Sequence, residues 1–186
     1  ADTAAPVVEE IALDLSANGY AMCIIDSGAD HADLTDEYAS ITRELAAVCG
    51  CFGKKVLREV PEEEFLAQLP RVRAAAGDRG VLRAFHVYAE NRRAAAEAQA
   101  LREGDFPRFL ELVRQSGCSS ALYLQNVVPT GQTGKQELLF AIALGERLLE
   151  GEGAIRVHGG GFGGTAQAFV PLAKLEAFRK GMEAVL

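Results

Sequence analysis

The sequence contains no tryptophan and has no excess of basic charge. Its 186 residues include 19 Lys and Arg against 26 Asp and Glu, which gives a formal net charge of −7. Binding to a phosphate backbone needs clustered Lys and Arg, and the sequence has no such cluster. We therefore expect no nucleic-acid partner, and an anionic membrane surface is disfavoured for the same reason.

Long hydrophobic runs are also missing. Apolar runs such as residues 20–25 are far shorter than the roughly 20 residues that span a bilayer. The first residues show no charged and apolar signal pattern. These absences predict a soluble, cytoplasmic protein with no membrane partner.

Cysteine is scarce, and its spacing is irregular. Cys23, Cys49, Cys51 and Cys118 form no Cys-x-x-Cys motif and have no nearby pair of histidines. Such spacing matches neither a zinc site nor a disulfide framework. We expect reduced thiols that pack as small apolar groups, and no metal site.

What is present indicates a folded protein that can bury a sizeable core. Hydrophobic residues make up 49% of the chain and charged residues 24%, which is the composition of a folded protein and not of a disordered one. The length fits one domain of ordinary size, or a domain with an appended hairpin.

The hydrophobic pattern predicts two strand pairs and five or six helices, an α+β fold without regular βαβ alternation. Residues 7–13 and 20–26 are β-rich runs around turn-forming residues 16–19, and they predict a hairpin. A second strand pair is expected at 154–157 and 165–170. Helices are expected over 35–49, from Pro61 to before Pro70, over 78–102, after an Asp105 cap and up to Gly117, over 138–149, and from Pro171. Residues 118–128 fit either a buried helix or a strand, and 129–135 fit a loop.

The most distinctive motif is the glycine run at 159–164, where five of six residues are glycine. Such density suits a loop whose backbone N–H groups approach an anion, and it equally suits a tight turn between two core strands. Gly159, Gly161 and Gly164 match the letters of the dinucleotide-binding motif. That motif needs a helix directly afterwards, whereas the following residues are strand-like, and no Walker-type GK[ST] follows.

Residues 157–171 (VHGGGFGGTAQAFVP) resemble the third signature motif of the galactokinases, in the GHMP superfamily of small-molecule kinases. The resemblance extends to residues 26–31 and 34–38 (DSGADH and LTDEY), 57–60 (LREV) and 82–106, and the whole chain can be placed in this way. It implies a GHMP-kinase C-terminal-type domain, with an antiparallel sheet of about four strands packed with helices. Residues 31–186 would form this domain, and residues 1–30 a β-hairpin at the junction with an N-terminal catalytic domain.

The resemblance also implies an activity for the full-length parent. Galactokinases transfer the γ-phosphoryl group of Mg-ATP to the C1 hydroxyl of galactose. Their sugar-binding segment, phosphate loop and catalytic aspartate lie in an N-terminal half that has no counterpart in this sequence. We therefore assign no catalytic residue here, expect the chain alone to be inactive, and expect ATP and Mg in the parent but not on this chain.

Two candidate site regions follow from the resemblance. Tyr38 matches a tyrosine whose hydroxyl contacts the sugar, although an aromatic residue on a helix face with its hydroxyl in water would look the same. The loop beside the substrate and the phosphate is matched by Gly159, Gly160, Gly161, Phe162, Gly163 and Gly164. Thr165 stands where many relatives have cysteine. His31 either stabilises a polar loop or contacts substrate, and His158 is a candidate for orienting the glycine run.

Two other functions stay open at this stage. Galactokinase-like proteins without kinase activity bind the sugar as regulatory sensors, and related kinases phosphorylate arabinose or fucose at C1. Where many galactokinases have consecutive arginines after the tyrosine, this chain has Ile41 and Thr42 before a single Arg43. Expected partners are galactose, ATP and the N-terminal domain, with a homodimer through exposed apolar surface as a further hypothesis.

Overall fold

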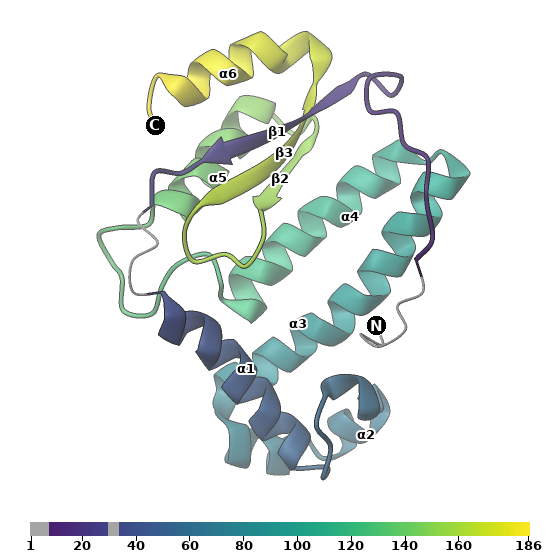
Figure 1. The fold of residues 1–186 in the computed structure, drawn as a ribbon, viewed down its shortest axis with the longest axis vertical. Helices are drawn as coiled ribbons and strands as arrows, with labels where there is room; N and C mark the ends of the chain where they lie inside the picture. Colours follow the sequence, from purple (N-terminus) through teal and green to yellow (C-terminus); the bar gives the residue numbers. More distant parts are fainter. Residues whose placement is uncertain (1–7, 30–33) are drawn as a thin grey trace.

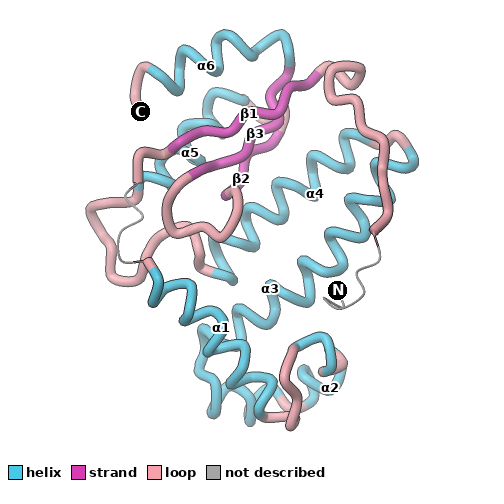
Figure 2. The backbone as a smooth tube through the Cα atoms, in the orientation of Figure 1, coloured by secondary structure: helices cyan, strands magenta, loops and turns pink. Residues whose placement is uncertain are grey.

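The computed structural model describes residues 8–29 and 34–186, and this part of the chain is mostly helical with one small sheet (Figure 2). Two short 3-10 turns and a π-helical turn join the longer elements. In chain order these are β1 (Tyr20–Asp26), α1 (Thr35–Gly50), η1 (Leu57–Glu59), α2 (Glu62–Ala67), α3 (Leu69–Glu103), α4 (Phe106–Ser119), η2 (Ser120–Leu124), α5 (Glu137–Leu149), β2 (Ala154–Val157), β3 (Thr165–Pro171), η3 (Leu172–Lys174) and α6 (Leu175–Glu183).

The sheet is antiparallel, and the described residues give it three strands in the order β1-β3-β2. Tyr20 pairs with Pro171 and Asp26 with Thr165, so the first strand lies beside the last one. The expected pair at 154–157 and 165–170 is confirmed, since β2 and β3 are neighbours. The predicted count of about four strands is wrong for the described residues, because residues 8–13 of the expected strand at 7–13 do not form a strand.

The hairpin predicted within residues 1–30 is absent from the described residues, and the segment before β1 shows why. Residues 8–14 have no regular structure. Glu9 and Glu10 break the alternation that a half-buried strand needs, and Glu9 forms an ion pair with Arg102 near the end of α3 (2.6 Å). The Asp14 carboxylate accepts from the Ser16 hydroxyl and the Ala17 N–H, which fixes a turn just before β1. The segment therefore runs beside the ends of α3 and α4 (Figure 1).

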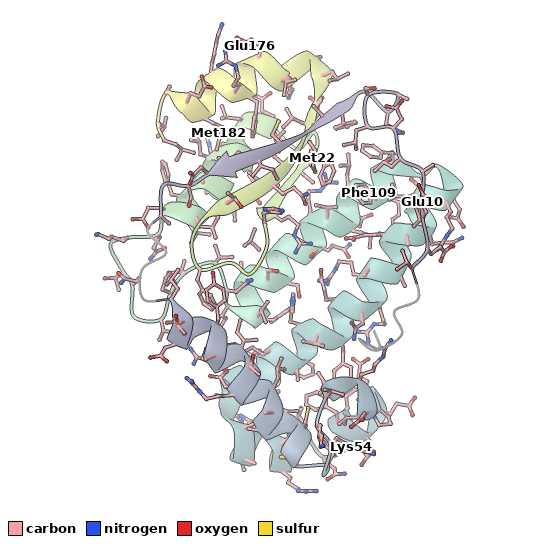
Figure 3. The ribbon with its side chains drawn as sticks, in the orientation of Figure 1. Glu10, Met22, Lys54, Phe109, Glu176 and Met182 are labelled. Atoms are coloured by element: carbon pink, nitrogen blue, oxygen red, sulfur yellow. The ribbon has the colours of Figure 1, made fainter. Side chains whose placement is uncertain are left out.

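Three buried apolar clusters hold these elements together. The sheet cluster joins the inner face of the sheet to α5 and α6, and the helical cluster joins α1, η1, α2 and α3. A third cluster joins α4 to the ends of α3 and of the sheet and includes Phe109, which Figure 3 labels on α4. Along α6, Met182 is buried in the sheet cluster whereas Glu176 points outward (Figure 3).

The helix predictions hold in most places. Residues 78–102 are helical within α3, although Gly77 (φ 74°, ψ 172°) breaks the helix and separates a preceding piece. The Asp105 carboxylate caps α4 through the Arg108 N–H (3.0 Å), as expected. Gly117 does not end this helix. A Cβ there would lie 3.0 Å from the Arg156 Cβ, so glycine allows close packing on β2.

The ambiguous segment at 118–128 is helical through Leu124 and irregular beyond it. Within the ranges 8–29 and 34–186, no helix is long and apolar enough to cross a membrane.

Candidate functional site

Tyr38 and the glycine loop, residues 159–164, lie in contact although they are far apart in the sequence. Tyr38 stands in the first turn of α1, and the loop joins β2 to β3 and reaches toward that end of α1 (Figure 1). The Tyr38 hydroxyl donates to the Gly161 carbonyl (2.8 Å). Its ring meets the Phe162 ring edge to face, with centroids 5.4 Å apart. Tyr38 keeps 39% of its surface exposed, so part of the ring still faces solvent.

The backbone of the loop explains why glycine is so frequent in it. Gly159, Gly161 and Gly164 have φ values of 68°, 86° and 81°, in the left-handed region that favours glycine. A Cβ on Gly161 would lie 2.0 Å from the Asn126 carbonyl oxygen, and one on Gly160 would lie 2.8 Å from the Tyr38 ring. The loop is therefore a strand connection shaped by close contacts. Because β3 and not a helix follows it, the rejection of the dinucleotide-binding motif is confirmed.

Phe162 is the one residue with a side chain inside this loop, and it also has a positive φ of 60°. That conformation is costly for an aromatic residue, so surrounding contacts have to hold it. Its side chain is buried, and its N–H donates to the Asn126 carbonyl.

Asn126 also bonds to the glycine loop, and it is not among the candidates taken from the sequence. It lies two residues after η2 and is 3% exposed. Its side-chain Nδ2 donates to the Gly160 carbonyl (3.1 Å), and its carbonyl receives the Phe162 N–H. The residue before it, Gln125, has φ 57°, which turns the chain out of the helix toward the loop. The available signal was a pair of adjacent amides, Gln125 and Asn126, between apolar residues in CSSALYLQNVV.

The two ends of the glycine loop are fixed by Ser27 and by the pair of His158 and Thr165. The Gly164 carbonyl accepts from both the Ser27 N–H (2.8 Å) and the Ser27 hydroxyl (2.6 Å). His158 Nδ1 lies 3.0 Å from the Thr165 hydroxyl, and the His158 N–H donates to the Thr165 carbonyl. His158 thus has a hydrogen-bonding partner at the base of the loop, and its role in orienting the loop stays a prediction. His31 lies outside the described residues.

A group of charged residues joins α1 to the segment that carries Asn126. Arg83 on α3 is fully buried, and Glu44 on α1 accepts from both Arg83 (2.9 Å) and Arg79 (2.6 Å). Burial lowers the pKa of the Arg83 guanidinium, and the nearby Glu44 carboxylate opposes this. Hydrogen bonding to Glu44 raises the pKa of Arg79. The sequence pattern alone does not point to these residues.

The four cysteines are free thiols, and burial raises the pKa of Cys23 and Cys49. In the part of the chain that the structure describes, no group of three or more His, Cys, Asp or Glu residues could hold a metal ion. Within the described ranges, the backbone N–H groups of Gly160, Gly161 and Gly163 donate no backbone hydrogen bond.

The curated proteins most similar in sequence that we compared are galactokinases. The galactokinase of Mannheimia succiniciproducens is 32% identical over 160 residues, covering 86% of this chain and 40% of that protein. The enzyme of Glaesserella parasuis is 31% identical over 162 residues, covering 87% of this chain and 40% of that protein. The chain matches the C-terminal portion of galactokinases. It spans about 40% of the length of these relatives, and no family model matches it.

Among solved structures, the fold is similar to that of Lactococcus lactis galactokinase complexed with galactose. The TM-score is 0.68 at 26% sequence identity, and the match covers 90% of this chain and 41% of that galactokinase. The chain thus has a galactokinase-like α+β fold, mostly helical with a small antiparallel sheet.

Proposed function

We propose that the full-length protein carrying this chain is a galactokinase, which transfers the γ-phosphoryl group of Mg-ATP to the C1 hydroxyl of galactose. In this proposal residues 31–186 act as the C-terminal GHMP-kinase domain, and an N-terminal domain supplies the phosphate loop and the catalytic aspartate. The likeness to galactokinases over 86% or more of the chain supports the proposal.

The observation that carries the proposal is the contact between Tyr38 and the glycine loop. The Tyr38 hydroxyl donates its proton to Gly161, so its lone pairs are left to accept a hydrogen bond from a sugar hydroxyl. Enzymes of phosphoryl transfer act mainly by positioning reactants and stabilising charge. Tyr38 and the glycine loop would form one side of the sugar site and orient the sugar for attack.

ATP would supply the phosphoryl group and Mg²⁺ would neutralise its developing charge. We assign no Mg²⁺ ligand to this chain, because the described residues hold no cluster of suitable side chains. The backbone N–H groups of Gly160, Gly161 and Gly163 donate no backbone hydrogen bond in the described ranges. This supports our proposal that the loop lies next to a phosphate group, which such N–H groups can bind. The purified 186-residue chain alone should transfer no phosphate.

The test is sugar 1-phosphate formation by the full-length protein with Mg-ATP and galactose, arabinose, fucose or glucose. Transfer to galactose alone is the expected result. Transfer only to arabinose or fucose would keep the chemistry and replace the proposed substrate. Galactose binding without any transfer would overturn the enzyme proposal in favour of a regulatory sensor.

A Tyr38→Phe variant tests the sugar contact directly. The change removes one hydroxyl, whose hydrogen bonds contribute about 0.5–1.5 kcal/mol each. We expect the KM for galactose to rise about three- to tenfold while the KM for ATP stays unchanged. Tyr20→Phe is the matched control, since Tyr20 packs on Phe106 in the third cluster. An unchanged KM for galactose would mean that Tyr38 only supports the loop.

Exposed apolar residues on β1 form a candidate contact surface for the N-terminal domain or for a second copy of this chain. Met22 and Ile24 on β1 are half exposed, and β1 is an edge strand within the described residues. In the full-length protein this apolar surface is a candidate contact for the N-terminal domain. In the isolated chain it is a candidate homodimer surface.

A further inference from the structure

Arg83 is an arginine whose side chain has no exposed surface, and it contacts two different parts of the chain. Its Nη1 donates to the Ser40 hydroxyl and to the Glu44 carboxylate on α1, at 2.9 Å each. Its Nε donates to the Leu124 carbonyl at the end of η2 (3.0 Å). One guanidinium thus connects α1 to the segment that leads into Asn126.

Arg79, one helical turn earlier on α3, adds a parallel connection. It donates to Glu44 and to the Thr130 hydroxyl (3.0 Å). On the other side, the Glu37 carboxylate on α1 accepts from the Thr130 N–H (2.8 Å) and hydroxyl (3.1 Å). Both ends of the segment from Leu124 to Thr130 are therefore bonded to α1, either directly or through the two arginines.

These connections enclose two of the residues that bond to the glycine loop. Tyr38 lies between Glu37 and Ser40 on α1, and it bonds to the Gly161 carbonyl. Asn126 lies between Leu124 and Thr130, and it bonds to the Gly160 carbonyl. A shift of α1 relative to residues 124–130 would therefore move Tyr38 away from Asn126, although the two bond to adjacent residues of the loop.

Ordinary helix packing does not require a charged group at position 83. Burying a guanidinium has a large desolvation cost, and an apolar side chain of similar volume often packs at least as well. A guanidinium differs from an apolar group because its rigid fork fixes the directions of several acceptors at once. The three acceptors of Arg83 come from α1 and η2, which meet at the site. The guanidinium therefore fixes the position of α1 relative to η2.

We propose that Arg83, paired with Glu44, is a positioning residue that sets Tyr38 and Asn126 at the correct separation around the glycine loop. It touches no reacting atom and acts through these two residues. The proposal rests on the proposed function for its kinetic consequence, whereas its structural consequence can be measured without any activity.

The test uses Arg83→Lys in the full-length protein. A lysine keeps the charge, but its single ammonium cannot reproduce the fork that serves three acceptors. We expect the KM for galactose to rise about tenfold with a smaller change in kcat. Hydrogen exchange should accelerate in peptides covering 34–44, 124–130 and 158–165, and should stay unchanged in α5 and α6.

Arg92→Lys on the same helix is the matched control, because Arg92 is mostly exposed and pairs with Glu62 of α2. If Arg83→Lys fails to fold, Ser40→Ala removes one of the acceptors with little change in volume, and the same peptides should exchange faster. Unchanged exchange in 158–165 in a folded variant overturns the proposal. Wild-type protein that phosphorylates no sugar overturns the proposed function instead, and the exchange result still decides the role of Arg83.

Discussion

The helical cluster and the sheet cluster are built from different side chains. In the helical cluster Phe65 lies at the centre, with its ring 5.4 Å from the rings of both Phe85 and Tyr88. The sheet cluster consists mainly of Ala, Val, Ile and Leu, joined by Phe178 and Met182 of α6. Tyr38 is carried by a helix of the first cluster, and the glycine loop is carried by strands of the second.

The connection between the two clusters at the site is polar. Hydrogen bonds from Tyr38 and Arg83 link helices of the helical cluster to the glycine loop and to the segment before Val127, with donor–acceptor distances of 2.8 and 3.0 Å. Apolar burial depends little on direction, whereas hydrogen bonds weaken steeply when they are misaligned. Stability should therefore depend on the two clusters, and the geometry of the site on the few polar contacts between them.

The largest effect is expected when the helical cluster is damaged. Phe65→Ala removes a fully buried aromatic ring and should lower the free energy of unfolding by about 3–5 kcal/mol. Urea unfolding measures this change. Phe140→Ala is the matched control, since Phe140 is 51% exposed on α5 and should cost less than about 1 kcal/mol. Equal losses in the two variants would contradict the assignment of Phe65 to a core.

A middle-sized effect is expected from Gly161→Ala in the glycine loop. The new Cβ would collide with the Asn126 carbonyl oxygen and would sit at φ 86°, so the loop has to move. We expect a loss of about 1–3 kcal/mol in stability and a weaker interaction with sugar. The comparison variant is Gly159→Ala, which has φ 68° but no atom within 4 Å of the added Cβ.

Both substitutions place a side chain at positive φ, so their difference reports the contact with Asn126 alone. Urea unfolding and sugar titration should both show Gly161→Ala as the more damaging change. A Gly159→Ala variant that is equally damaging would show that the backbone conformation matters and the contact does not.

The smallest effect concerns His86, which lies in a polar cluster between α3 and α4. Its Nδ1 is 2.9 Å from the Ser119 hydroxyl, and Glu90, Arg93 and Arg156 are the charged groups around it. Burial lowers the pKa of His86 below its ordinary value of 6.5. As the pH falls, His86 therefore takes up its proton in the unfolded chain before it does so in the folded protein. The contribution of neutral His86 to the free energy of unfolding is fully present above pH 6.5 and is lost as the pH falls below that value.

The measurement is the urea midpoint between pH 7 and pH 5 for the wild type and for His86→Gln. The variant should lose less stability over this interval than the wild type. Parallel pH curves for the two proteins would show that His86 does not contribute to the slope.

Local patterns in the sequence were enough to predict much of this fold. The periodicity of α5 and the helix formers of α3 are local signals, and the strands on both sides of the glycine loop follow from their composition. The first strand of the predicted hairpin failed because its apolar residues do not alternate, and because the partner of β1 comes from the other end of the chain. Strand pairing of this range leaves no local signal.

In the candidate site too, some residues have a local signal in the sequence and others do not. The glycine run predicted the loop between two strands, and the resemblance to galactokinases made Tyr38 a candidate for the sugar contact, which stays a prediction. Arg83 could not be recognised, because a charged residue in a helical segment is typical of a solvated face, and its acceptors come from α1 and η2. Asn126 was missed because its segment fits helix and strand equally well, and its role depends on a loop 34 residues later.

The pairing of β1 with β3 also affects how the chain is made. Ser27 and Gly164 meet across 137 residues, and ribosomes add about 5–20 residues each second. The first strand therefore waits on the order of ten seconds before its partner is synthesised. During that time the helical cluster, drawn from residues 45–88, is complete in sequence and can form first. The unpaired strand, with Met22 and Ile24 exposed, is then the part of the nascent chain that most needs protection from misassociation.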